Sequence, residues 1–230
     1  RLELESLIDS GHLVTHPHRG WLTPRNWFVE AVGTTPPFRM DRFYRKVRTS
    51  TGWLMTNGQP VGGKYSFDEE NRKPWKGEPA APSVPVFESD KIDSEVEELV
   101  NRVFHDHPGS IDFSQIPTTH HDVGRMLDFA RQCLMHFGTY EDAMSTDSRG
   151  LFHTRLASLL NLHRVMPRMA IELALESDAQ LNNIEGFVRQ LIWREYVHHI
   201  HEVTDGFRTL EINRSMSRRD ANWHETAPLD

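Results

Sequence analysis

The chain has 230 residues, of which 37% are hydrophobic, enough to bury a core without a metal or disulfides. Its formal net charge of -7 excludes a protein coated with basic residues but leaves room for local cationic patches, so charge neither shows nor excludes a nucleic-acid partner. No apolar run approaches the roughly 20 residues of a membrane span, and the single cysteine, Cys133, favours a reducing compartment; we expect a cytoplasmic protein that contacts no membrane.

The first 73 residues are predicted to hold two helices, a short strand and a hairpin. PRNWFVEAV (24–32) and MDRFYRKVR (40–48) are typical of helices, and HLVTH (12–16) is typical of a short strand. Asn57-Gly58 predicts a hairpin, because both residues tolerate the positive φ of a type I′ turn. A basic run in the second helix is interpreted as a solvated face, with phosphate contact as the alternative. It consists of Arg39, Arg42, Arg45, Lys46 and Arg48.

Residues 74–117 are predicted to connect two parts of the molecule through one helix. Residues 74–92 carry four prolines and no helical period, which indicates a connector or an ordered surface crossing. Ser94 is the expected N-cap of the helix that follows, with Glu97 completing a capping box and Pro108-Gly109 ending the helix.

The remainder is predicted to be helical. Thr118 or Thr119 is expected to begin a helix that ends at Gly138. Further helices are expected within 156–165, 167–176 and 184–203.

Two segments of this region carry candidate binding residues. Phe187, Gln190 and Arg194 share one face of the last helix; Arg194 either pairs with an acid on a neighbouring helix or binds a polar ligand. His153, Thr154 and Arg155 precede an apolar helix, where free N–H groups could hold an anion, although capping residues open most helices.

The histidines near the C-terminal end of the last helix raise the question of a metal site. Glu195 and His198 have the Glu-x-x-His spacing of carboxylate-bridged metal bundles, with His199 and His201 beside them. Such a site needs a second Glu-x-x-His motif, which the sequence lacks, so we predict no metal site here.

Five segments in fixed order resemble one known family. They are GGKYSFDEENRKP (62–74), FSQIPTTHHDVGRMLDF (113–129), FGTYEDAM (137–144), LFHTRLASLLNL (151–162) and EGFVRQLIWREY (185–196). Together they resemble the deoxyribodipyrimidine photolyase-related proteins, the prokaryotic branch of the photolyase and cryptochrome superfamily that includes iron-sulfur (6-4) photolyases. The resemblance runs through most of residues 38–201.

The resemblance implies a mainly α fold, with the end of a Rossmann-like α/β antenna domain followed by part of an all-helical FAD-binding domain. The corresponding boundaries are 1–73 for the antenna part, 74–117 for the connector and 118–230 for the partial FAD domain. It also implies light-driven electron transfer from reduced FAD to a lesion in UV-damaged DNA, in a protein that is monomeric when intact. The alternatives are a cryptochrome-like photoreceptor without repair activity and a helical fragment that binds no ligand.

The resemblance also implies roles for single residues, but it assigns no catalytic residue. Flavin contacts fall on Tyr140, on the segment His153, Thr154, Arg155, Leu156 and Ala157, and on Phe187 and Gln190; DNA contacts fall on Trp193 and Arg194. Ala157 and Gln190 depart from the serine and glutamate of many relatives. In the first motif, Asp68, Asn71 and Arg72 are expected to anchor a loop through hydrogen bonds, without a chemical role.

The same resemblance predicts a middle fragment of a longer protein. The chain begins without methionine, and the cysteine ligands of a four-iron four-sulfur cluster and the strands that would hold a ribityl-lumazine antenna have no match in it. Residues 207–230 do not resemble the family. We therefore expect the 230 residues alone to be inactive.

Overall fold

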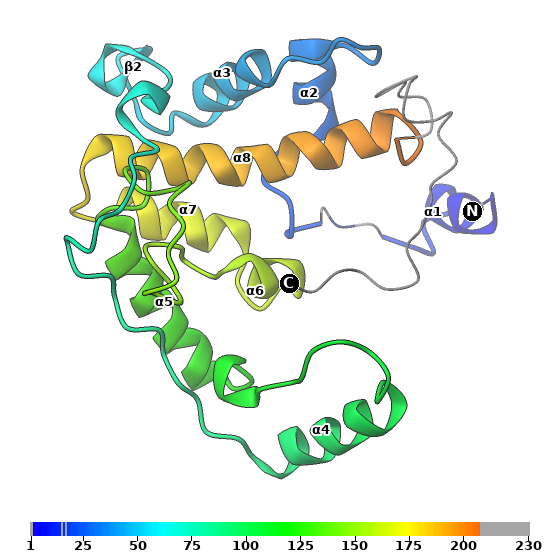
Figure 1. The fold of residues 1–230 in the computed structure, drawn as a ribbon. Coiled ribbons are helices and arrows are strands. Elements are labelled where there is room, and N and C mark those ends of the chain that lie inside the picture. The colour runs from blue at the N-terminus through cyan, green and yellow to red at the C-terminus, as the bar shows by residue number, and fades with distance from the viewer. Residues whose placement is uncertain (1, 15, 17, 208–230) are drawn as a thin grey trace, which may run out of the picture.

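The structure, a computed structural model, describes residues 2–14, 16 and 18–207, and this part is mainly helical (Figure 1). The long helix α8 (Leu181–Val203) crosses the middle of the fold; α2 (Arg25–Val32) and α3 (Met40–Thr51) pack on one side of it, and α5 (His120–Leu134) and α7 (Pro167–Leu175) on the other. The other elements are α1 (Leu2–Asp9), β1 (Met55–Thr56), β2 (Gln59–Pro60), α4 (Lys91–Val103), α6 (Ala157–Asn161) and the 3-10 turns Val61–Gly63, Asp68–Glu70 and Phe113–Gln115.

α8 is central because apolar side chains surround much of it, so contact on several sides removes them from water. One cluster of buried residues extends from Phe28 through Phe129 to Tyr196, and so draws on the first 73 residues as well as on those after 118. The predicted domain boundaries stay a prediction. None of the helices in the described ranges has both the length and the apolar character needed to cross a membrane.

The hairpin predicted at Asn57-Gly58 is confirmed. β1 pairs antiparallel with β2, and Asn57 and Gly58 have φ values of 51° and 74°. Arg48 of α3 ties this hairpin to the helix: its guanidinium donates to the carbonyl oxygens of Trp53 (2.7 Å) and Leu54 (2.6 Å). Arg48 is only 1% exposed, so the prediction that the basic run is a solvated face is wrong at this position.

Two other local predictions are corrected. Residues 12–14 and 16 form no strand. α4 is capped by Asp90. The Asp90 side chain accepts from the N–H of Asp93, and the Asp93 side chain accepts from the N–H of Asp90. The capping box therefore lies four residues before the one predicted at Ser94.

The cap of α5 is confirmed at Thr119, which forms a capping box with Asp122. The helix ends at Leu134 rather than at Gly138, and a series of turns covers the three residues between them.

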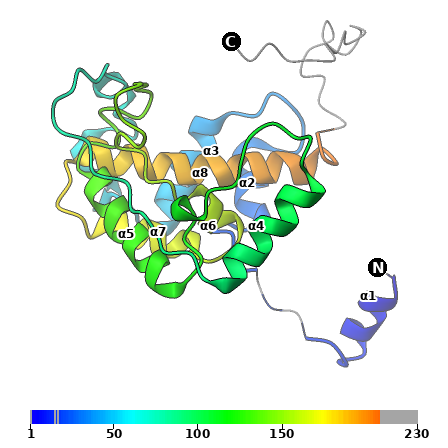
Figure 2. The same ribbon diagram turned by 60° about the horizontal axis from the view of Figure 1, so that its bottom comes forward.

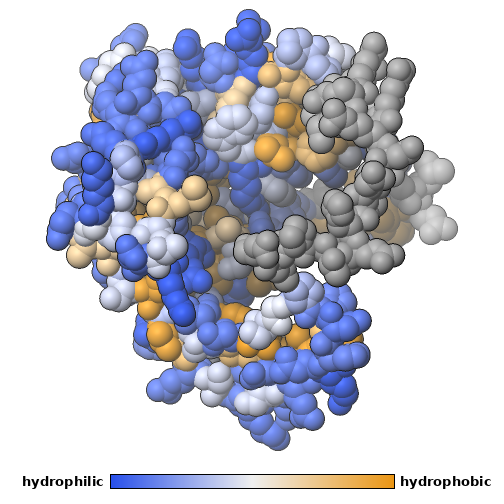
Figure 3. Space-filling model, viewed as in Figure 1, coloured by the Kyte–Doolittle hydropathy of each residue, from blue (hydrophilic) through white to orange (hydrophobic). Residues whose placement is uncertain are grey.

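Residues 71–90 contain no helix or strand and cross the surface as predicted. Phe87 fixes their far end, since its side chain is buried and its N–H donates to the carbonyl of Ser114 (2.9 Å). α4, which follows, extends away from α8, and apolar surface is visible on it in Figure 3. Figure 2 shows α1 standing apart from the helices around α8.

Candidate functional site

A groove open to solvent runs along the exposed side of the C-terminal half of α8. Its volume is about 500 Å³. Trp21 lines it from the loop before α2, and Asn161 from the last position of α6. The other lining residues are Trp193, Arg194, Val197, His198, His201 and Phe207.

The loop that carries Trp21 is held against α8 by Glu195, which is fully buried. One oxygen of this carboxylate, Oε2, accepts from the N–H groups of Leu22 (2.7 Å) and Thr23 (3.0 Å) and from the Thr23 hydroxyl (3.0 Å). Burial raises the pKa of Glu195, and these three bonds oppose the shift. Glu195 therefore positions the wall of the groove.

Arg194 is the cation of the groove. Its guanidinium donates to the carbonyl of Gly20 (3.0 Å) and lies 4.0 Å from the centre of the Trp21 ring, within cation–π range. The nearest described carboxylate is that of Glu195, the next residue on α8, at 3.5 Å, so the prediction of an acid on a neighbouring helix is wrong. Burial lowers the pKa of Arg194, and its Nε–H has no acceptor within the described chain.

The predicted phosphate segment lies directly before α6. The N–H of His153 donates to Gly150, whereas those of Thr154, Arg155 and Leu156 meet no acceptor among the residues that the structure describes. Arg155 is exposed with a φ of 55°, and the helix begins two residues later. Three free N–H groups can take an anion, so this segment fits the diphosphate of a dinucleotide cofactor. α6 joins it to the groove, because Asn161 ends that helix.

The other predicted flavin residues lie outside the groove. The ring of Tyr140 stacks on Phe152, with centroids 5.2 Å apart, and its hydroxyl donates to the carbonyl of Glu78 (3.3 Å). The ring of Phe187 is buried and packs edge-on against the ring of Phe137, with centroids 5.1 Å apart. Gln190 donates to Glu141 (3.4 Å). The stripe predicted on α8 is thus covered by residues 137–141 in its first half and reaches the groove only at Arg194.

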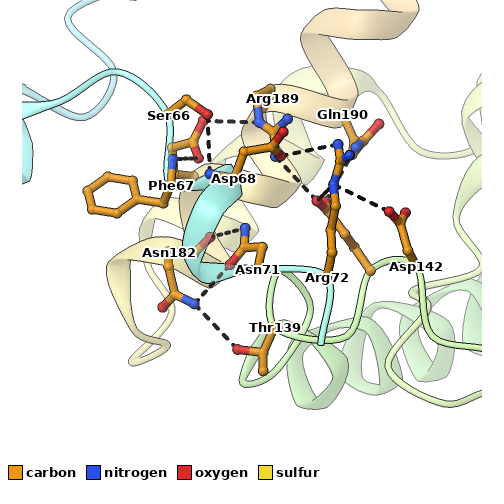
Figure 4. Close-up of polar contacts among 12 residues, drawn as sticks. Ser66, Phe67, Asp68, Asn71, Arg72, Thr139, Asp142, Asn182, Arg189 and Gln190 are labelled. Atoms are coloured by element: carbon orange, nitrogen blue, oxygen red, sulfur yellow. Dashed lines mark hydrogen bonds and ion pairs between the residues drawn. The ribbon is translucent and has the colours of Figure 1, made fainter. Parts of the chain in front are cut away.

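The expected anchors of residues 62–74 do hold that loop (Figure 4). Asp68 pairs with Arg189 of α8 (2.5 Å), and Arg72 pairs with Asp68 (3.2 Å) and Glu141 (3.3 Å). The side chain of Glu141 is 3% exposed and also meets Arg189 at 3.3 Å, so two arginines share it.

Asn71 fills the space where this loop meets two glycines. Its amide donates to the carbonyl of Asn182 (3.3 Å) and accepts from the Asn182 side chain (3.0 Å). A Cβ at Gly186 would lie 3.2 Å from Cα of Gly138, so the two backbones approach closely there. The stretch is therefore an ordered joint between α8 and residues 137–141.

Sequence reasoning assigned no role to Trp21, Asn161 or Glu141. Glu141 lies within the FGTYEDAM motif. Nothing in the sequence shows that the side chain of Glu141, rather than that of its neighbour Tyr140 or Asp142, is the buried one. Trp21 and Asn161 reach the groove through loop packing, which leaves no periodic signal in the sequence.

Comparison with known proteins gives a family match and two relatives. The sequence profile of the deoxyribodipyrimidine photo-lyase-related protein family matches residues 2–115. The chain is 40% identical over 183 residues to a (6-4) photolyase of Agrobacterium fabrum (strain C58), which covers 77% of this chain and 35% of that protein. It is 36% identical over 62 residues to the uncharacterized protein R853 of Acanthamoeba polyphaga mimivirus, covering 25% of this chain and 48% of that protein. The chain thus spans about a third of the first relative and half of the second.

Proposed function

Because this chain is a photolyase-related protein, we propose that it forms part of a flavin-dependent enzyme that repairs UV lesions in DNA with blue light. Reduced FAD would supply the electron for the repair. The observation that carries the proposal is the groove beside α8, where the half-buried cation Arg194 lies over the ring of Trp21 and the exposed Trp193 is a further lining residue. Aromatic rings with a cation beside them suit nucleobases and their phosphates.

The chain offers its own groups for the cofactor. The N–H groups of Thr154, Arg155 and Leu156 would hold the diphosphate, with His153 and Ala157 flanking them. The remaining proposed flavin contacts rest on the family resemblance alone. Tyr140 packs on Phe152 next to this segment, Phe187 is buried in the core, and Gln190 is exposed.

DNA would lie along the exposed side of α8. Trp193 is 39% exposed and can stack on an unpaired base, an interaction worth about 1–3 kcal/mol. The guanidinium of Arg194, whose side chain is 19% exposed, would supply positive charge for a phosphate oxygen. The chain as a whole carries a net charge of -7, so the protein's overall charge would not attract DNA. The attraction would come from the positive charge within the groove.

Substitution of Arg194 tests the DNA side. Arg194→Ala should weaken binding to UV-damaged DNA and reduce the slope of log affinity against log salt by about one, because one phosphate contact is lost. Trp193→Ala should weaken binding about tenfold and leave the slope unchanged, because stacking releases no counterions. The matched control is Arg131→Ala, an exposed arginine on α5 that pairs with Asp128. Unchanged affinity and slope in Arg194→Ala would remove this groove from the DNA site.

Comparison of two flavins tests the cofactor side. FAD should bind more tightly than riboflavin in a fluorescence titration, because riboflavin lacks the diphosphate that the free N–H groups of residues 154–156 would hold. Equal affinity for the two would contradict the assignment of this segment.

A further inference from the structure

Three side chains at the C-terminal end of α8 bring ligand atoms for a metal ion together. One atom from each of His198, His199 and Glu202 lies within 4.8 Å of the other two. His199 is 2% exposed, His198 is half-buried and Glu202 is exposed, so the cluster extends from the core to solvent.

The hydrogen bonds of His199 determine which ring nitrogen carries its proton. The Thr23 hydroxyl donates its single proton to Oε2 of Glu195 (3.0 Å), and Oε2 already accepts two backbone N–H groups. The contact of 2.9 Å between Thr23 Oγ1 and Nε2 of His199 therefore requires the ring nitrogen to donate. In the neutral ring, Nδ1 is then left with a lone pair.

The lone pair on Nδ1 of His199 faces a carboxylate oxygen of Glu202, which is also an acceptor. Nδ1 of His199 lies 3.4 Å from Oε2 of Glu202. Two acceptor atoms face each other across that distance unless a cation or a proton lies between them.

The distances suit a transition-metal ion. Two ligands bound at about 2.0–2.1 Å in tetrahedral geometry are about 3.4 Å apart, which is the separation of Nδ1 and Oε2. Ligands on opposite sides of an ion are at most about 4.2 Å apart, so the largest separation of 4.8 Å must close by about 0.6 Å.

The surroundings resemble the outer shell of a metal centre. His199 donates its other ring nitrogen to Thr23, and Thr23 is bound in turn by Glu195, an arrangement that fixes ring orientation in metal sites. The ring of His198 stacks on Trp21, with centroids 3.7 Å apart. Oε1 of Glu202 lies 3.6 Å from Arg25, which leaves Oε2 for the ion.

We propose that His198, His199 and Glu202 form a site for one divalent transition-metal ion, of which Zn²⁺ is the reference case, with water in the remaining positions. The Glu-x-x-His spacing in the sequence pairs Glu195 with His198. In the fold, however, the Glu195 carboxylate accepts hydrogen bonds from Leu22 and Thr23, so it acts as an outer partner of the site. A site for a single ion also needs no second Glu-x-x-His motif, and that motif was the ground for predicting no metal here.

Calorimetric titration of the full chain with Zn²⁺, without a histidine tag, tests the proposal. One ion should bind with micromolar affinity or better, and Glu202→Gln and His198→Gln should each weaken this binding at least tenfold. Both substitutions lie outside the core, so the variants should fold, which thermal unfolding without metal verifies. The matched control is His201→Gln, on the same helix but outside the cluster; its affinity should stay within twofold.

Titration with Co²⁺ gives a second readout, because the visible spectrum reports how many ligands surround the ion. The wild-type chain should show absorption bands that Glu202→Gln loses and His201→Gln keeps. The proposal is overturned if the wild-type chain binds no Zn²⁺ at micromolar concentrations, or if the loss in His201→Gln equals that in Glu202→Gln.

Discussion

Gly138 is needed because a backbone carbonyl and a polar side chain occupy the space where its Cβ would lie. An added Cβ would be 2.6 Å from the carbonyl oxygen of Asn182 and 2.7 Å from Nδ2 of Asn71. Gly138→Ala should therefore lower the free energy of unfolding by about 1–3 kcal/mol, as overpacking does. Gly124→Ala is the control: nothing lies within 4 Å, and alanine favours the helix by up to about 1 kcal/mol. Urea denaturation measures both, and equal stabilities would contradict the close approach.

Glu185 should make stability depend on pH. Burial raises its pKa above the usual 4.5, against hydrogen bonds from Phe67 and Tyr44 and the charge of Arg189. A raised pKa means that the folded chain holds the proton more tightly than the unfolded chain, so the contribution of Glu185 is complete below pH 4.5 and is lost as pH rises through the folded pKa. As the pH rises from 4.5 through the folded pKa, the free energy of unfolding of wild type should fall relative to that of Glu185→Gln. Parallel profiles would show that Glu185 does not titrate there.

The helix α4 depends on its cap more than on packing, because Ile92, Leu99 and Val103 are exposed along it. Asp90→Ala should remove the capping box, cost about 1 kcal/mol and speed amide exchange in the first turn about fivefold. Ser94→Ala should change little, because its hydroxyl only donates to the carbonyl of Asp90 from an exposed position. If Ser94→Ala speeds amide exchange in the first turn more than Asp90→Ala does, the N-cap of α4 is Ser94, as predicted from the sequence.

The open groove sets a limit on cofactor retention by the 230 residues. A ligand gains affinity when most of its surface is buried in a preformed pocket, and this groove is open to solvent along α8. We expect FAD to bind reversibly and to separate from the chain in gel filtration, as shown by loss of absorbance in the flavin bands. Stoichiometric FAD after filtration, with repair of lesions under blue light, would show that the 230 residues suffice to close the site.

Local signals were sufficient for several features. Asn57-Gly58 predicted the hairpin and Thr119 the start of α5, because turns and caps depend on residues a few positions apart. Apolar residues around α8 predicted its burial, and the anchors Asp68, Asn71 and Arg72 were identified correctly, although their partners were not. The family was recognised from ordered motifs, which need no knowledge of packing.

Which polar groups face each other depends on how distant segments pack together. Glu195 meets Thr23 across 172 positions of sequence, and Glu185 meets Tyr44 across 141. Helical periodicity shows which side of α8 is buried, but the loop that packs there determines whether a buried Arg, Glu or His finds a carbonyl, a ring or a carboxylate. For this reason the sequence pairs Glu195 with His198 in a metal motif, whereas its partners in the fold are Leu22 and Thr23. Burial follows from local pattern, whereas the partner of a buried polar group follows from contacts between distant segments.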